Sequence, residues 1–297
     1  MSRTATEIAT QPSSWTRAAE AAAVFDGLPK PGERVAVTGC GTSWFMAVAY
    51  AGLRQAAGQG ETDAFASSEF PVGRPYDRVV AITRSGTTTE VLELLAELRG
   101  RTTTVALTAD PGTPVMDAAD AVAVLDWADE ESVVQTRFAT TALAFLRAGL
   151  GAVPGVKPLA EAVVDAELAV TEPLAEAVVG AEQWTFLGRG WSYGLALEAA
   201  LKMREAAGAW TEAYPAMEYR HGPISITGPQ RVAWMFGVLP DGLAADVARV
   251  GGELVARQGT DPMADLIRVQ RLAVTLAEAK GYDPDHPRNL SRSVVLG

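Results

Sequence analysis

The chain has 297 residues, 48% of them hydrophobic and 21% charged, a composition typical of a globular protein of about two domains. Its net charge of −11, spread without long runs of one sign, argues against a nucleic-acid-binding protein. The single cysteine excludes an intramolecular disulfide and fits a reducing compartment, and no cysteine or histidine cluster indicates a metal site. The first residues lack an apolar signal core, and no stretch is long enough to span a bilayer. We therefore expect a cytoplasmic protein without a membrane partner.

The first half of the chain alternates between predicted strands and helices. A polar lead precedes a helix that Ser13 or Ser14 caps and that continues through Phe25. Apolar runs predict strands at 34–39, 62–66, 78–83, 103–108 and 121–126, and helical spacing predicts helices after residue 41, at 91–98 and at 133–150. This alternation predicts an α/β fold with a parallel sheet that helices cover on both faces.

The second half repeats part of the first. After a linker at 151–158 and a helix to about residue 179, residues 184–201 echo residues 35–53. The matches share one offset and pair Gly39 with Gly188, Gly41 with Gly190, and Ser43 with Ser192. A repeated strand–loop–helix unit predicts two related lobes, and the thinner pattern beyond residue 240 makes the second lobe the smaller. We predict an N-terminal arm over 1–33, a first lobe over 34–155, and a second lobe with a C-terminal tail over 156–297.

Two loops in the first lobe, residues 38–43 and 83–88, each follow a strand and begin a helix. Amides at a helix N-terminus face an anion readily, and hydroxyl groups add donors. Because both loops lie at the carboxyl ends of strands in one sheet, we expect them at the edge where open α/β sheets bind ligands. The alternative is that they only cap helices. Neither loop has the G-K-[ST] pattern of nucleotide-hydrolysing enzymes. The predicted anion-binding residues are Thr42, Ser43, Thr83, Arg84, Ser85, Thr87 and Thr88.

A second group of polar residues begins on a predicted helix that ends at Gly208. Lys202 and Glu205 are three residues apart and therefore share one helix face, on which Glu198 also recurs. The chain then reaches Glu218 and His221. A carboxylate and a histidine at one concave site suit proton transfer on a small molecule. The alternative is a surface ion pair followed by a histidine in a turn.

The motifs GCGTSW at 39–44, ITRSGTTTEVL at 82–92 and EYRHGP at 218–223 resemble those of the sugar isomerase (SIS) domain family. The resemblance covers nearly the whole chain and is to the isomerase half of glucosamine-6-phosphate synthase and its stand-alone relatives. It implies two SIS lobes, each a flavodoxin-like three-layer unit, and a phosphosugar site at the two Ser/Thr loops. It further implies that Glu205 moves a proton between C1 and C2 and that Lys202 lies beside it. His221 would open the sugar ring from the partner subunit of a homodimer. No cofactor or metal is implied.

The chain also departs from the synthase pattern. It has no glutaminase domain, so we do not expect glutamine as a nitrogen source. Arg84 and Thr83 stand where the synthase has glutamine and serine. Arg292 stands where the synthase has a tail lysine that forms a Schiff base with the ketose. A guanidinium stays protonated and does not act as that nucleophile, although it can bind an oxyanion.

The expected function is therefore an aldose–ketose isomerase or an amino-sugar-phosphate deaminase, acting on a sugar phosphate or a sulfo-sugar through an enediol or enolamine. Glu218 and Arg292 are further candidates for substrate binding. The alternative is a non-catalytic sugar-phosphate-binding sensor or regulator. A DNA-binding regulator would need a helix-turn-helix, and the first 33 residues predict only one helix. We interpret Cys40 as a packing residue rather than a nucleophile.

Overall fold

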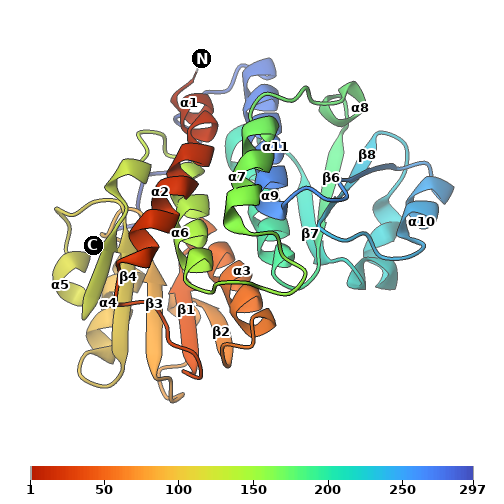
Figure 1. The fold of residues 1–297 in the computed structure, drawn as a ribbon. Helices are drawn as coiled ribbons and strands as arrows, with labels where there is room; N and C mark the ends of the chain where they lie inside the picture. The colour runs from red at the N-terminus through yellow and green to blue at the C-terminus, as the bar shows by residue number, and fades with distance from the viewer. Residues whose placement is uncertain (1, 297) are drawn as a thin grey trace.

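The computed structural model describes residues 2–296 and contains two parallel β-sheets with helices around and between them (Figure 1). The first sheet has the order β2-β1-β3-β4-β5 and the second the order β7-β6-β8-β9. Every pairing is parallel, so the carboxyl ends of each sheet meet at one edge. The predicted α/β fold with parallel sheets is confirmed. The strands are β1 (Val35–Gly39), β2 (Thr62–Ala66), β3 (Arg78–Ile82), β4 (Thr103–Thr108), β5 (Ala121–Val124), β6 (Gln183–Gly188), β7 (Thr211–Pro215), β8 (Arg231–Phe236) and β9 (Glu253–Ala256).

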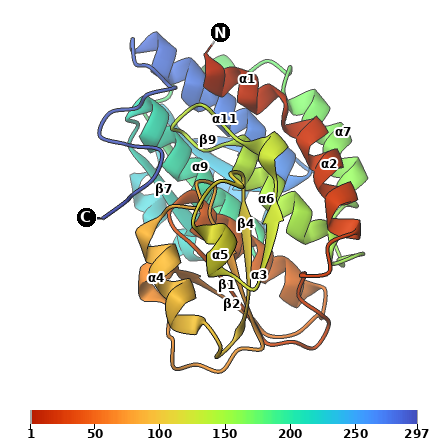
Figure 2. The ribbon, with the colours of Figure 1, turned by 90° about the vertical axis from the view of Figure 1, so that its left-hand side faces the viewer.

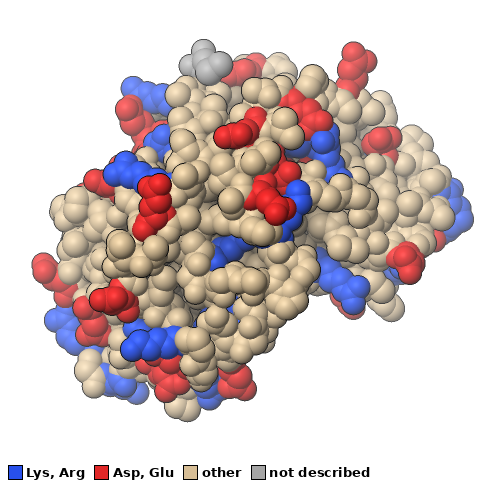
Figure 3. Space-filling view, viewed as in Figure 1, with Lys and Arg blue, Asp and Glu red and all other residues tan. Residues whose placement is uncertain are grey.

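A layer of helices fills the space between the two sheets, and shorter helices cover their outer faces (Figure 1). The inner layer consists of α2 (Gln11–Ala23), α3 (Thr42–Ala56), α6 (Arg137–Ala148), α7 (Leu159–Ala169), α9 (Ser192–Ala207) and α11 (Pro262–Ala279). Outside the first sheet lie α4 (Thr89–Leu98) and α5 (Val115–Ala118), and outside the second lies α10 (Leu243–Arg249). On the face shown in Figure 3, acidic and basic side chains are interspersed and form no large patch of one sign.

The two repeated units predicted from the sequence occupy the same position in their sheets. The strand of the repeated unit is β1 in the first sheet and β6 in the second. Each lies second in its sheet's order and leads into a helix of the inner layer. These helices, α3 and α9, pack directly against each other. A Cβ at Gly194 of α9 would lie 2.5 Å from the carbonyl oxygen of Phe45 in α3, and one at Gly52 of α3 would lie 2.7 Å from Cα of Trp191. Only glycine permits this approach, which joins the two halves of the chain.

The N-terminal prediction is wrong in one respect. The polar lead is itself a helix, α1 (Arg3–Ala9), whose N-cap Ser2 accepts a hydrogen bond from the amide of Ala5, and α2 already begins at Gln11. Residues 2–33 therefore contain two helices. Such a short helix is not stable alone; contacts with the distant tail support α1, since Thr4 donates to a carboxylate oxygen of Asp285 at 2.7 Å. The residues around α1 in the sequence do not reveal that contact, because Asp285 lies near the other end of the chain.

Three other element boundaries differ from expectation. Helix α6 begins at Arg137, because the buried Glu130 carboxylate accepts the amides of Thr136 and Arg137 and so caps its N-terminus. The helix expected to reach about residue 179 is divided into α7 and α8 (Glu176–Val179), with Pro173 in the gap between them. Strand β7 was not predicted. It is an edge strand of half-buried residues and therefore lacks a continuous apolar run.

Candidate active site

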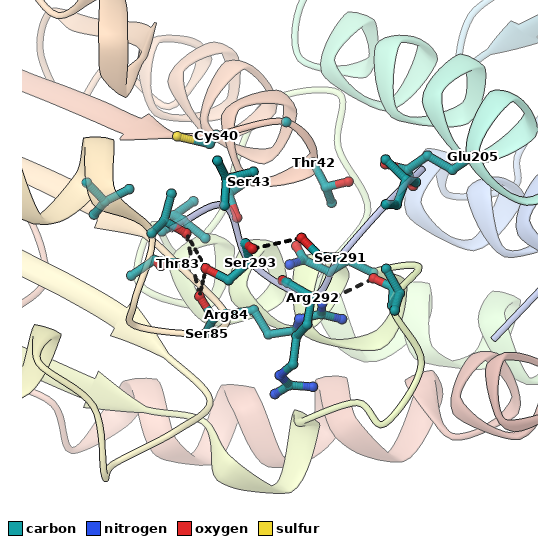
Figure 4. Close-up of a pocket in the computed structure, with 18 residues that line it drawn as sticks. Cys40, Thr42, Ser43, Thr83, Arg84, Ser85, Glu205, Ser291, Arg292 and Ser293 are labelled. Carbon is teal, nitrogen blue, oxygen red and sulfur yellow. Dashed lines mark hydrogen bonds between the residues drawn. The ribbon is translucent and has the colours of Figure 1, made fainter. Parts of the chain in front are cut away.

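One cavity of about 210 Å³ lies at the carboxyl edge of the first sheet and brings together most of the predicted site residues (Figure 4). The loops after β1 and β3 form one side, Glu205 of α9 reaches it from another, and the C-terminal tail crosses it. Sequence reasoning placed the loops at one sheet edge, and the parallel pairing of β1 with β3 puts them there. The predicted residues that line the cavity are Thr42, Ser43, Thr83, Arg84, Ser85, Thr88, Glu205 and Arg292.

The loop after β3 supplies a cluster of hydroxyl groups beside the start of α4. Ser85 Oγ accepts the amide of Thr87 at 3.3 Å and lies 3.5 Å from Thr88 Oγ1. Thr83 Oγ1 is buried in the cavity wall and has no hydrogen-bond partner among the residues that the structure describes. Buried hydroxyl groups are normally satisfied, so this unpaired one is an unusual feature of the cavity wall. The hydroxyls and the α4 N-terminus together suit an anionic group.

The two arginines predicted to bind the anion are engaged with other groups. The Arg84 side chain is 3% exposed and lies 3.4 Å from the Glu130 carboxylate, and it donates to the carbonyl oxygens of Ser132 and Val133 at 3.1 Å each. Arg292 binds the carboxylate of Asp129 and the carbonyl oxygen of Glu130. Figure 4 shows the Arg292 guanidinium pointing away from the hydroxyl cluster. Both side chains therefore hold the walls of the cavity in place.

Helix α9 carries a row of three charged side chains, Glu198, Lys202 and Glu205, that extends from the core to the cavity. Glu198 and Lys202 are sealed, with side chains 0% and 1% exposed, whereas Glu205 is 19% exposed. Lys202 Nζ lies 3.5 Å from Glu198 and binds the Glu205 carboxylate directly. Spacings of four and three residues put all three on one helix face. Glu205 is thus the member of the row that can touch a bound molecule.

Burial and neighbouring charges shift the pKa values of Glu198 and Lys202. Burial raises the pKa of Glu198 to about 8, although the Lys202 charge acts in the opposite direction. Within residues 2–296 neither oxygen of Glu198 accepts a well-aligned hydrogen bond, although the nearby Thr42 hydroxyl also acts to lower the pKa. For Lys202, burial favours the neutral amine, but the charges of Glu198 and Glu205 together outweigh it and raise the pKa. At neutral pH a protonated Glu198 therefore lies behind a charged lysine. Sequence analysis placed Glu198 on this face but did not assign it to the site.

Glu218 and His221 lie outside this cavity. They belong to a 3₁₀ helix, Glu218–His221, that follows β7 of the second sheet. His221 is exposed, and its neighbour Arg220 is held by Asp246 at 2.8 Å. The other histidine, His286, lines a second hollow that also includes Glu205, and sequence analysis did not assign this histidine to the site. His286 Nδ1 lies 3.1 Å from the Asp283 carboxylate.

Cys40 lines the cavity beside Gly41 and packs partly against apolar side chains of the first sheet. Burial raises the pKa of its thiol, which disfavours the thiolate that a nucleophile requires. This agrees with its interpretation as a packing residue.

Comparison with known proteins identifies relatives of similar sequence. The chain is 31% identical to the isomerizing glutamine–fructose-6-phosphate aminotransferase of Acidithiobacillus ferridurans, over 75% of this chain and 44% of the relative. It is 26% identical to that of Bacteroides thetaiotaomicron, over 89% of this chain and 51% of the relative. The resemblance to the sugar isomerase domain family is confirmed. The chain spans about half the length of the curated relatives it matches. No protein-family model matches it.

Solved structures of a sugar-phosphate deaminase and a sugar-phosphate isomerase share the whole fold. A glucosamine-6-phosphate deaminase from Thermotoga maritima superimposes with a TM-score of 0.80 at 22% identity and covers 99% of this chain and 100% of its own. A tagatose-6-phosphate ketose/aldose isomerase from Escherichia coli gives 0.77 at 18% identity and covers 97% of both chains. At these identities the matches establish the fold, and the chemistry has to be argued from the site. No helix within residues 2–296 is long and apolar enough to cross a membrane.

Proposed function

We propose that this SIS protein is a sugar-phosphate isomerase or amino-sugar-phosphate deaminase that moves a proton between C1 and C2 of an open-chain sugar. The observation that carries the proposal is that one cavity joins a cluster of hydroxyl donors to the carboxylate of Glu205. The donors suit the anionic end of the sugar, and the carboxylate suits a carbon acid next to a carbonyl. The related aminotransferases, whose name includes an isomerizing activity, and the isomerase and deaminase of the same fold support this assignment.

In the proposed reaction, Glu205 accepts the proton from the carbon beside the carbonyl, and the electron pair of that C–H bond forms the carbon–carbon double bond of an enediolate whose negative charge lies on the former carbonyl oxygen. A proton then passes to this oxygen from the hydroxyl group on the neighbouring carbon. Glu205 then returns the proton to the adjacent carbon. Lys202, bound to Glu205 from behind, holds the carboxylate in position for this transfer. When C2 carries an amine, the same transfer produces a C2 imine, which water hydrolyses to a ketone and ammonia. A general base of this kind contributes about 10²–10⁴-fold to a rate.

We further propose that the anion is a phosphate or sulfonate, and that the working unit is a homodimer whose His221 reaches the partner's site. Two observations support the second part. His221 is exposed and is not part of the cavity wall of its own chain, whereas Glu205 also faces a second hollow of about 560 Å³ through which another group can approach. The proposed mechanism uses no metal. Activity should therefore persist in EDTA.

The decisive experiment is proton exchange in heavy water followed by NMR. Glucosamine-6-phosphate, fructose-6-phosphate and sulfofructose are offered separately to the purified protein, and ammonia is measured in parallel. Deuterium at C1 or C2 of one sugar is the expected result, and ammonia release distinguishes a deaminase from an isomerase. Tight binding of these sugars with neither exchange nor ammonia would instead make the protein a sugar-phosphate sensor.

A further inference from the structure

The C-terminal tail contributes a hydroxyl group to the cluster at the start of α4. Ser85 Oγ donates to Ser293 Oγ at 3.1 Å, and Thr87 Oγ1 donates to the same oxygen at 3.0 Å. Thr88 Oγ1 lies 3.4 Å from it. Figure 4 shows Ser293 reaching from the tail toward the loop that carries Ser85. One oxygen atom therefore accepts from two hydroxyl groups that the sequence predicts to bind the substrate anion.

The tail also accepts a hydrogen bond from the backbone at the start of α4. The amide of Thr89, the first residue of α4, donates to the carbonyl oxygen of Val294 at 3.3 Å. Amide groups in the first turn of a helix have no partner within the helix and are the donors that bind anions. Ser293 and Val294 thus satisfy both kinds of donor, hydroxyl and amide, that an anion would use.

Residues on both sides of Ser293 fasten the tail here. Arg292 binds Asp129 and the carbonyl oxygen of Glu130, and Arg84 donates to the carbonyl oxygen of Arg292 at 3.3 Å. Little apolar surface holds the tail in addition, because Val295 and Leu296 are 67% and 61% exposed. Polar contacts therefore dominate the attachment, and an anion that offers the loop stronger hydrogen bonds can compete for the same donors.

We propose that Ser293 is an internal competitor for the anion subsite, with its Oγ holding the position of one anion oxygen until the sugar's phosphate or sulfonate displaces it. This rests on the proposed function. Ionised oxygens accept stronger hydrogen bonds than a hydroxyl, so the exchange favours the substrate, and its cost lowers the apparent affinity. Arg84 and Arg292 are then positioning residues of the tail and do not bind the anion.

The test is isothermal titration calorimetry with fructose-6-phosphate, glucosamine-6-phosphate and inorganic phosphate. Ser293→Ala removes the competing oxygen, and we expect it to tighten binding roughly two- to tenfold, the equivalent of one net hydrogen bond. Ser293→Asp places a carboxylate in the cluster and should weaken binding at least tenfold. Thr89→Val is the matched control, because it removes another tail contact, from Thr89 Oγ1 to the amide of Leu296 at 2.9 Å, and leaves the Ser293 cluster intact.

Each other outcome counts against the proposal. Weaker binding by Ser293→Ala would mean that Ser293 donates to the anion, and unchanged binding would mean that its oxygen lies outside the subsite. An equal gain in Thr89→Val would assign the effect to general loosening of the tail. These results leave the proposed function intact, since the wild type still binds the sugars. If none of the probes binds the wild type or Ser293→Ala, the proposed function and this inference are both wrong.

Discussion

The carboxylate of Glu198 lies 3.5 Å from Nζ of Lys202, and both side chains are sealed inside the helical layer between the sheets. Burial raises the pKa of this carboxyl group to about 8, and the nearby Lys202 ammonium and Thr42 hydroxyl only partly oppose that rise. At neutral pH the lysine is therefore free to direct its charge toward Glu205. Above pH 8 a second carboxylate competes for the same ammonium group, which should weaken its hold on Glu205.

This relationship predicts how turnover depends on pH in the alkaline range. We expect wild-type turnover to fall above about pH 8, and Glu198→Gln to retain turnover there, because the amide resembles the protonated acid and does not ionise. The exposed Glu167→Gln of α7 is the control and should follow the wild type. Identical alkaline limbs for Glu198→Gln and the wild type would exclude Glu198 from this role.

The same carboxyl group predicts a change of stability with pH. The folded state retains the proton of Glu198 up to about pH 8, whereas the ordinary pKa is 4.5. Between these values the folded state binds more protons, so the free energy of unfolding falls as pH rises. The Glu198→Gln variant has no ionisable group at this position, so its free energy of unfolding does not include this fall. Its melting temperature should therefore improve relative to the wild type as pH rises from about 5 to about 8. A constant difference across that range would contradict the prediction.

Glu205→Gln tests the proposed base. The amide keeps the shape of the side chain but does not accept the carbon-bound proton, so exchange should fall by about 10²–10⁴-fold while calorimetry still detects sugar binding. Glu97→Gln, at an exposed position of α4, provides the control for a glutamate-to-glutamine change. A rate equal to the wild type would remove Glu205 from the mechanism.

Mixed dimers test whether two chains share one site. Glu205→Gln and His221→Ala protomers should each be inactive alone, and subunit exchange between them should restore up to about a quarter of wild-type activity. Subunit exchange is verified independently by labelling one protomer. If activity does not return, the histidine must come from the same chain, and His286 at the second hollow beside Glu205 becomes the candidate.

Gly194→Ala tests the contact that joins the two halves. Its new Cβ would lie 2.5 Å from a backbone oxygen of α3, so the helices must separate, which should lower the free energy of unfolding by about 1–3 kcal/mol in urea titrations. Because α3 begins with Thr42, sugar affinity should fall as well. Gly73→Ala is the control, since no atom lies within 4 Å of its Cβ position. Equal stability of the two variants would show that α3 and α9 tolerate the methyl group.

Several features followed from local patterns alone. Strand–loop–helix alternation indicated parallel sheets, and parallel strands end at one edge, so the loops carrying Ser43 and Ser85 had to meet. Helical spacing put Lys202 and Glu205 on one face. The assignment of residues to three domains remains a prediction, as do the catalytic roles. Local patterns did not indicate that α1 is a helix, because its support comes from Asp285 near the other end of the chain.

The sequence by itself determined the parallel α/β fold, the repeated unit and the two Ser/Thr loops, because short-range periodicity and the chemistry of loop residues specify them. Only the tertiary structure decided which side chains are exposed to the cavity and which are engaged elsewhere. Arg84 is charged in any fold, but packing turned it toward Glu130 and the carbonyl oxygens of its neighbours. Ser293 is one serine among many until the tail folds back onto α4 (Figure 2). Contacts between residues 200 positions apart depend on the packing of the whole chain, which no local pattern records.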